Sequence, residues 1–279
     1  MVQSMKSTFL HGANVRANGI RQHYLRYGGK GRPVVIVPGI TSPAVTWGFV
    51  AEHFGQQFDT YVLDVRGRGL SDASDALDYG LDACADDVAA FARALGLEGY
   101  ALVGHSMGAR IGVRAARKHP GGLERLVLID PPVAGPGRRR YPAKLDWYID
   151  SIRLMRDGAG MQALRPFSPT WSVEQLQLPS EWLHTCNERA IVASYNGFHE
   201  DDFHADLPFV KQPTLLMVAG RGDVIRAEDI DEIKQLKPMI EIAHVPAAGH
   251  MIPWDDEAGF LQAFGGFLGA PLGHAANDR

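Results

Sequence analysis

The stretch LVGHSMGAR, residues 102–110, places a serine between two glycines where a predicted strand meets a predicted helix. The apolar run 100–103 leads into it, and residues 107–118, rich in Ala and Arg, lead out and stop before Pro120. A strand that turns sharply into a helix at a serine is a nucleophile elbow, in which glycines prevent clashes between Cβ atoms. Ser106 is therefore a candidate nucleophile, at a helix N-terminus that favours developing negative charge. The alternative is a glycine-rich turn with an incidental serine, which the pentapeptide alone leaves open.

Buried strands alternate with helices along most of the chain. A hairpin is predicted over 14–28, around Asn18-Gly19, and amphipathic helices over 81–96 and 256–269. This alternation favours a mostly parallel sheet covered by helices on both faces. The predicted buried strands are 33–37, 58–64, 100–105, 123–130, 213–219 and 240–245.

The segment 133–207 interrupts this alternation because it contains no buried strand pattern. It holds several helical patterns and most of the tryptophans, and the sequence GPGRRRYP stands near its start. We call residues 133–207 the cap segment and predict a helical insertion between two core strands. The predicted α/β core then consists of residues 1–132 and 208–279.

Composition excludes several classes of function. The formal net charge is -4 and no basic tract is present, so nucleic acid is not an expected partner. No apolar run of about 18 residues predicts a membrane span, and the N-terminus lacks the pattern of a signal peptide. Only two cysteines occur, which does not suggest a disulfide framework. We therefore expect a cytoplasmic protein; its oligomeric state is not predicted.

A serine nucleophile needs a base and an orienting acid, which follow it along the chain in the order acid, then histidine. His250 lies in a loop after the last predicted strand and is the candidate base. Asp130 and Asp223 each follow a core strand, where sites of open α/β sheets form, and either is a candidate acid. The alternative for each aspartate is a turn or cap role.

The oxyanion hole requires two backbone amides. One is expected from Met107, directly after the serine, and the other from Ile40 in the loop PGIT. His105 is predicted to be a packing or hydrogen-bonding residue. No metal and no cofactor are predicted, because the cluster of His184, Cys186, His199 and His204 fits no familiar ligand spacing.

These motifs together resemble the α/β-hydrolase family, and within it the deformylases of N-formylmaleamate from nicotinate degradation. The resemblance is carried by VPGITSPAVTWGFV, YVLDVRGRGLSD, LVGHSMGAR, LVLIDPPV, EWLHTC and AGHMIPWDD. The chain is also similar to hydrolases of acetamidomethylene succinate. The resemblance implies an eight-stranded, mostly parallel sheet flanked by helices, with a helical cap.

The resemblance implies a triad of Ser106, Asp130 and His250, although the wider superfamily more often places the acid at the position of Asp223. The implied reaction is hydrolysis of the C–N bond of a small acylated amide, N-formylmaleamate plus water giving maleamate and formate. A general carboxylesterase, a hydrolase of a related acylamino dicarboxylate, and a hydrolase-fold binding protein with weak activity are the alternatives.

A small anionic substrate suggests a cationic partner in the cap segment. Basic residues crowd its first half, and arginine suits bidentate carboxylate binding, although such runs are usually solvated. Aromatic residues there can form the pocket wall or pack the cap on the core. The candidate substrate-binding residues are Arg139, Arg153, Trp147, Tyr148 and Trp182.

Overall fold

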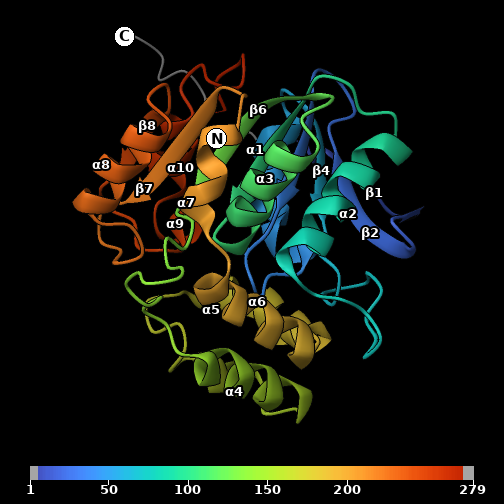
Figure 1. The fold of residues 1–279 in the computed structure, drawn as a ribbon. Helices are drawn as coiled ribbons and strands as arrows, with labels where there is room; N and C mark the ends of the chain where they lie inside the picture. The colour runs from blue at the N-terminus through green and yellow to red at the C-terminus, as the bar shows by residue number, and fades with distance from the viewer. Residues whose placement is uncertain (1–5, 273–279) are drawn as a thin grey trace, which may run out of the picture.

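The computed structural model describes residues 6–272, which build one eight-stranded sheet in the order β1-β2-β4-β3-β5-β6-β7-β8 (Figure 1). The first two strands are antiparallel to their neighbours, and all later pairs are parallel. The predicted α/β-hydrolase architecture is thus confirmed. The strands are β1 (Phe9–Ala17), β2 (Ile20–Tyr27), β3 (Pro33–Val37), β4 (Asp59–Leu63), β5 (Tyr100–His105), β6 (Leu123–Ile129), β7 (Thr214–Ala219) and β8 (Glu241–Val245).

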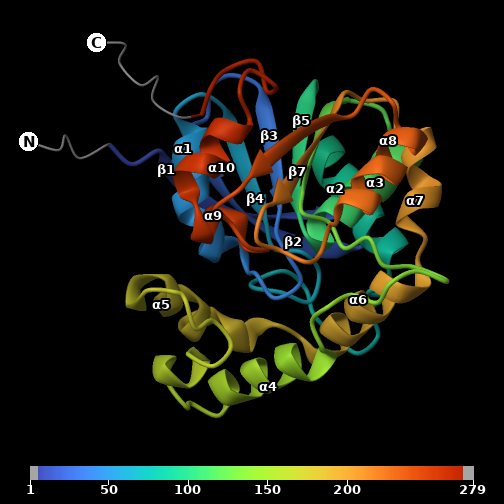
Figure 2. The ribbon, with the colours of Figure 1, turned by 90° about the vertical axis from the view of Figure 1, so that its left-hand side faces the viewer.

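Helices cover both faces of the sheet, as the alternating pattern predicts (Figure 2). One apolar cluster joins the sheet to α2 (Leu81–Ala94), α3 (Met107–Lys118) and α8 (Ala227–Leu236). The other cluster joins it to α1 (Gly48–Gly55), α9 (Ile252–Asp255) and α10 (Glu257–Ala263). The central strands are apolar on both sides because both faces are buried.

Two element boundaries differ from the sequence prediction. Strand β1 begins at Phe9 rather than near residue 14, because its pairing with β2 extends from Ala17↔Ile20 back to Phe9↔Tyr27. The predicted helix 256–269 ends at Ala263, and Gly265 follows with a positive φ of 48°. Such a conformation suits glycine and stops the helix.

The cap segment lies between β6 and β7 and contains helices but no strand within the described residues. Figures 1 and 2 show α4, α5 and α6 together on one side of the main body. Helix α7 instead contacts α3 of the main body. The segment's elements are α4 (Leu145–Arg156), η2 (Met161–Leu164), α5 (Val173–Trp182), η3 (Leu183–Thr185), α6 (Glu188–Glu200) and α7 (Phe203–Asp206), and η4 (Leu207–Phe209) begins at its last residue. Outside the cap segment, a further short helix, η1 (Ala44–Trp47), precedes α1. Across residues 6–272, no helix has the length and apolarity needed to cross a membrane.

Candidate active site

Ser106 occupies a strained turn between β5 and α3. Its backbone has φ 53° and ψ -114°, a conformation that residues with a Cβ rarely adopt. A Cβ on Gly104 would lie 2.3 Å from the carbonyl oxygen of Gly108, and a Cβ on Gly108 would lie 1.9 Å from the carbonyl oxygen of Val37. Both glycines of the motif are therefore required by close backbone contact, and the strain is concentrated at the serine.

His250 connects Ser106 to Asp130. Its Nε2 lies 3.0 Å from Ser106 Oγ and its Nδ1 lies 2.7 Å from Asp130 Oδ2. A carboxylate only accepts hydrogen bonds, so Nδ1 carries the proton and Nε2 is free to accept one from the serine hydroxyl. This is the geometry that a base between a nucleophile and an orienting acid requires.

Asp130 is held in place by the sheet. It follows β6 with a positive φ of 45°, is 1% exposed, and its Oδ1 accepts from the Ala219 amide at 3.3 Å. In the β5–β6 ladder His105 pairs with Ile129, so Ser106 and Asp130 are the next residues of neighbouring strands. The strand order of the sheet thus brings the acid next to the nucleophile.

Asp223, the alternative acid, borders the same cavity but has another partner. Its carboxylate is bound by the Arg226 guanidinium at 2.7 and 2.9 Å, and its side chain is 58% exposed. The hydrogen bond from Arg226 keeps the pKa of Asp223 below its ordinary value. In the same loop, a Cβ at Gly222 would lie 3.7 Å from the His250 amide nitrogen and 3.8 Å from Asp130 Oδ2.

The loop after β3 lies against the elbow. A Cβ on Gly39 would lie 3.7 Å from the Cβ of Ser106, so Ile40 and Met107 flank the nucleophile from two sides. Their backbone amides donate no hydrogen bond within residues 6–272. Two unused amides beside a serine hydroxyl are suited to an oxyanion.

His105 supports the loop that carries the base. It is 1% exposed, and its Nε2 donates to the carbonyl oxygen of His250 at 3.0 Å. Burial lowers the pKa of His105 to about 3, so it stays neutral. This agrees with the hydrogen-bonding role predicted for it.

Tyr141 was not identified from the sequence. Its hydroxyl lies 3.2 Å from His250 Nε2 and accepts from the Tyr148 hydroxyl at 3.3 Å. Burial raises the pKa of Tyr141 to about 12, so it remains a phenol. The only sequence feature near Tyr141 that could have drawn attention to it was the Tyr-Pro pair at the end of GPGRRRYP.

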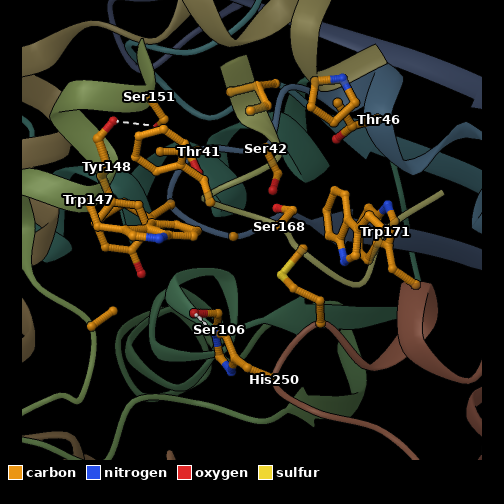
Figure 3. Close-up of a pocket in the computed structure, with 18 of the residues that line it drawn as sticks. Thr41, Ser42, Thr46, Ser106, Trp147, Tyr148, Ser151, Ser168, Trp171 and His250 are labelled. Carbon is orange, nitrogen blue, oxygen red and sulfur yellow. Dashed lines mark hydrogen bonds between the residues drawn. The ribbon is translucent and has the colours of Figure 1, made fainter. Parts of the chain in front are cut away.

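A cavity of about 530 Å³ opens over Ser106, a volume suited to a small molecule. Figure 3 shows Ser106 and His250 on one side, with Trp147, Tyr148 and Ser168 across from them. Apolar and aromatic residues dominate the wall, and no lysine or arginine lines it within the described residues. The lining residues that carry hydroxyl groups are Thr41, Ser42, Thr46, Ser106, Tyr141, Tyr148, Ser151, Ser168 and Thr170.

The structure brings Trp147 and Tyr148 to this cavity, but not the other candidates of the cap segment. Arg139 binds the Asp229 carboxylate at 2.6 Å, and Arg153 binds the Glu188 carboxylate at 2.7 Å. Each arginine pairs with a carboxylate that is distant in sequence, which turns it away from the cavity. Trp182 is likewise absent from the wall, whereas Trp171, not selected from the sequence, lines it and stacks on Trp254 at 5.6 Å.

Comparisons with known proteins agree with this architecture. The family model described as alpha/beta hydrolase fold matches residues 32–257. An N-formylmaleamate deformylase of Pseudomonas putida is 64% identical over 266 residues, covering 95% of this chain and 99% of that protein. The crystal structure of an N-formylmaleamic acid deformylase, also from Pseudomonas putida, superposes with a TM-score of 0.88 at 53% identity, covering 91% and 99% of the two chains. A 2-(acetamidomethylene)succinate hydrolase of Mesorhizobium japonicum is 25% identical over 82% of this chain and 84% of that protein.

Proposed function

This chain belongs to the N-formylmaleamate deformylase family of α/β-hydrolases, and from that premise we propose that Ser106, His250 and Asp130 hydrolyse N-formylmaleamate to maleamate and formate. His250 Nε2 takes the proton of the Ser106 hydroxyl as the oxygen attacks the formyl carbonyl. Asp130 holds the Nδ1 proton and stabilises the imidazolium that forms. The chain is thus a serine hydrolase that acts on a linear amide.

The tetrahedral intermediate places its negative charge on the former formyl oxygen. The backbone amides of Ile40 and Met107 donate to this oxygen, and the N-terminus of α3 adds to the stabilisation. His250 then gives its proton to the departing nitrogen, the C–N bond breaks, and maleamate leaves. A formyl ester remains on Ser106.

Deformylation repeats these steps with water as the nucleophile. His250 takes a proton from the water as its oxygen attacks the formyl ester, and the second tetrahedral intermediate uses the same two amides. When the ester bond breaks, His250 returns the proton to Ser106 and formic acid leaves, which ionises to formate and a proton in water. The atoms and charges balance without a cofactor.

We place the substrate carboxylate against neutral hydrogen-bond donors rather than against an arginine. Thr41, Ser42 and Ser168 line the cavity, and their hydroxyl groups make no hydrogen bond within residues 6–272. The first two follow Ile40 directly, and Ser168 faces the cavity from the cap segment. The cap segment 133–207 accordingly acts as a cover that supplies the distal half of the binding site.

One observation carries the substrate assignment: the 64% identity over almost the full length of a protein named for this reaction. The relay from Ser106 through His250 to Asp130 supports the serine chemistry. The fit of a small planar amide to an aromatic cavity of about 530 Å³ supports the substrate size.

The test is formate release. Purified protein is incubated with N-formylmaleamate, and formate and maleamate are quantified; we expect equal amounts. Ser106→Ala should lower kcat by roughly four orders of magnitude or more, because only the oxyanion hole and binding remain. 2-(Acetamidomethylene)succinate and a small nitrophenyl ester serve as competing substrates. A fully active Ser106→Ala variant would rule out the mechanism, and preference for either competitor would rule out the substrate.

A further inference from the structure

Arg68 is a buried arginine in the loop after β4. It is 1% exposed, and each of its three guanidinium nitrogens donates a hydrogen bond inside the protein. It forms no ion pair with a carboxylate within residues 6–272, unlike buried Arg66, which binds Asp87. A guanidinium remains protonated in proteins, so Arg68 places a positive charge in the interior without a direct counter-ion.

The partners of Arg68 include both residues expected to form the oxyanion hole. Its Nε donates to the carbonyl oxygen of Ile40 at 3.0 Å, and its Nη2 lies 3.4 Å from Met107 Sδ. Its Nη1 donates to the Arg66 carbonyl oxygen at 2.8 Å, which fixes the guanidinium relative to its own loop. One rigid group therefore touches the loop after β3 and the first residue of α3.

The same guanidinium reaches the cap segment. Its Nη2 donates to the hydroxyl of Ser194 at 2.8 Å and to the carbonyl oxygen of Ala190 at 3.2 Å, both on α6. The loop after β3, the start of α3 and helix α6 are thus tied to one planar group. Planarity matters, because a fork of donors fixes the direction as well as the distance of each partner.

Nearby thiols do not neutralise this charge. Burial raises the pKa of Cys84 to about 11 and that of Cys186 to about 12, so both are uncharged at neutral pH. A charge surrounded by neutral groups in a medium of low dielectric acts over a longer range than a surface charge. Its field therefore extends to the neighbouring oxyanion position.

We propose that Arg68 is a positioning residue for the oxyanion hole: it holds Ile40 and Met107 in place and adds positive potential where the negative charge of the intermediate develops. This rests on the serine-hydrolase function proposed above. Since the charge appears only in the transition state and intermediate, Arg68 raises kcat rather than substrate affinity. It also supplies positive potential near a cavity that no lysine or arginine lines within residues 6–272.

Arg110 provides a matched control. It is 2% exposed, and within residues 6–272 its guanidinium donates to the carbonyl oxygens of Pro132, Ala134, Gly197 and Asp201. It likewise joins the main body to α6, but its guanidinium makes no hydrogen bond to Ile40 or Met107 within these residues. Loss of either arginine costs buried hydrogen bonds, whereas only loss of Arg68 should change the chemistry.

The experiment compares Arg68→Met, Arg68→Lys and Arg110→Met with the parent enzyme. For Arg68→Met we expect kcat with N-formylmaleamate to fall about 100-fold, in the range seen on loss of an oxyanion donor, with KM within about threefold. Arg68→Lys keeps the charge but not the fork, so we expect an intermediate loss. It also keeps the test possible if Arg68→Met does not fold. We expect Arg110→Met to keep kcat within about threefold at temperatures where it is folded.

A second readout separates positioning from simple support of the fold. A small alkylboronic acid forms an anionic tetrahedral adduct with a serine, and its affinity should fall in Arg68→Met in parallel with kcat, while inhibition by maleamate stays constant. Unchanged boronate affinity, or an equal loss of kcat in Arg110→Met, would overturn the proposal. Repeating kcat with a nitrophenyl ester keeps these outcomes distinct from failure of the substrate assignment, since the ester uses the same oxyanion hole.

Discussion

The ends of β5 and β6 and the cap segment contribute to one cavity in contrasting ways. At the strand ends, Ser106 and Asp130 are almost fully buried on backbone with positive φ, and register fixes their neighbours. Across the cavity, the cap segment presents aromatic rings and hydroxyl groups. The comparison teaches that rigid, strained backbone positions the reacting groups, whereas a layer of replaceable side chains sets what the cavity accepts.

The charges of the two regions differ as well. Three arginines of the cap segment are partly exposed and paired: Arg138 binds Glu232, and both Arg153 and Arg156 bind Glu188. Charged side chains beside the strand ends, such as Asp130 and Arg68, are buried. Exposed pairs contribute little to stability, so the cap's arginines are surface charges rather than parts of the site.

The largest expected difference is between the two candidate acids. Asp130→Asn should reduce kcat by roughly three to four orders of magnitude, because the amide no longer holds the correct tautomer of His250. Asp223→Asn removes only an exposed pair with Arg226 and should change kcat less than about threefold. Circular dichroism checks that each variant is folded. A nearly normal Asp130→Asn enzyme beside an inactive Asp223→Asn enzyme would reverse the assignment.

A smaller effect should distinguish the cavity hydroxyls from the cap arginines. Ser42→Ala should raise KM for N-formylmaleamate about tenfold, since a hydrogen bond to a charged group contributes about 1.5 kcal/mol. Arg153→Ala, which loses a surface pair, should leave KM within about twofold.

The carboxamide analogue of the substrate is the control for this comparison. The increase in KM caused by Ser42→Ala should be smaller with the carboxamide, because the charge that strengthens the hydrogen bond is gone. A rise in KM confined to Arg153→Ala would instead restore the arginine as the carboxylate partner.

The smallest effect concerns stability in acid and not activity. His204 on α7 is 2% exposed, and neither ring nitrogen makes a hydrogen bond within residues 6–272, although Nε2 lies 3.9 Å from Glu232 Oε2. Burial lowers the pKa of His204 to about 4. Between about pH 6.5 and 4 the unfolded chain binds a proton at this residue that the folded chain does not. The free energy of unfolding should therefore be constant above this window and fall as the pH drops through it.

Urea unfolding at several pH values measures this contribution. His204→Leu should flatten the acid slope by up to about 1.4 kcal/mol per pH unit, whereas His184→Leu, at an exposed position, should not. An unchanged slope in His204→Leu would assign the acid sensitivity to other groups, of which buried His105 is the first candidate.

The sequence predicted the sheet because its signals are local: apolar runs mark buried strands, and the glycines around Ser106 mark the elbow. The acid stayed open because strand order is not local. Only the adjacency of β5 and β6 places Asp130 beside Ser106, where His250 meets both, and Asp223 lies four residues beyond the end of β7. Arg139 was assigned to the cavity for a similar reason, since its partner Asp229 is 90 residues away.

Tyr141 and Arg68 are residues near the candidate site that the sequence analysis did not select. Tyr141 belongs to no motif with a known spacing, and Arg68 lies in YVLDVRGRGLSD, a motif that assigns it no role. Each gains its place through contacts with segments far along the chain. Composition and periodicity describe which residues are buried, but not which buried group meets the base or the oxyanion loop.

Gly222 shows how close the loop after β7 comes to the acid and the base. A Cβ at this position would lie within 4 Å of both the Asp130 carboxylate and the His250 backbone, and 3.1 Å from the Cβ of Ala219. The loops after β6 and β7 therefore both reach the imidazole, so a carboxylate that orients His250 can belong to either loop with Ser106 and His250 unmoved.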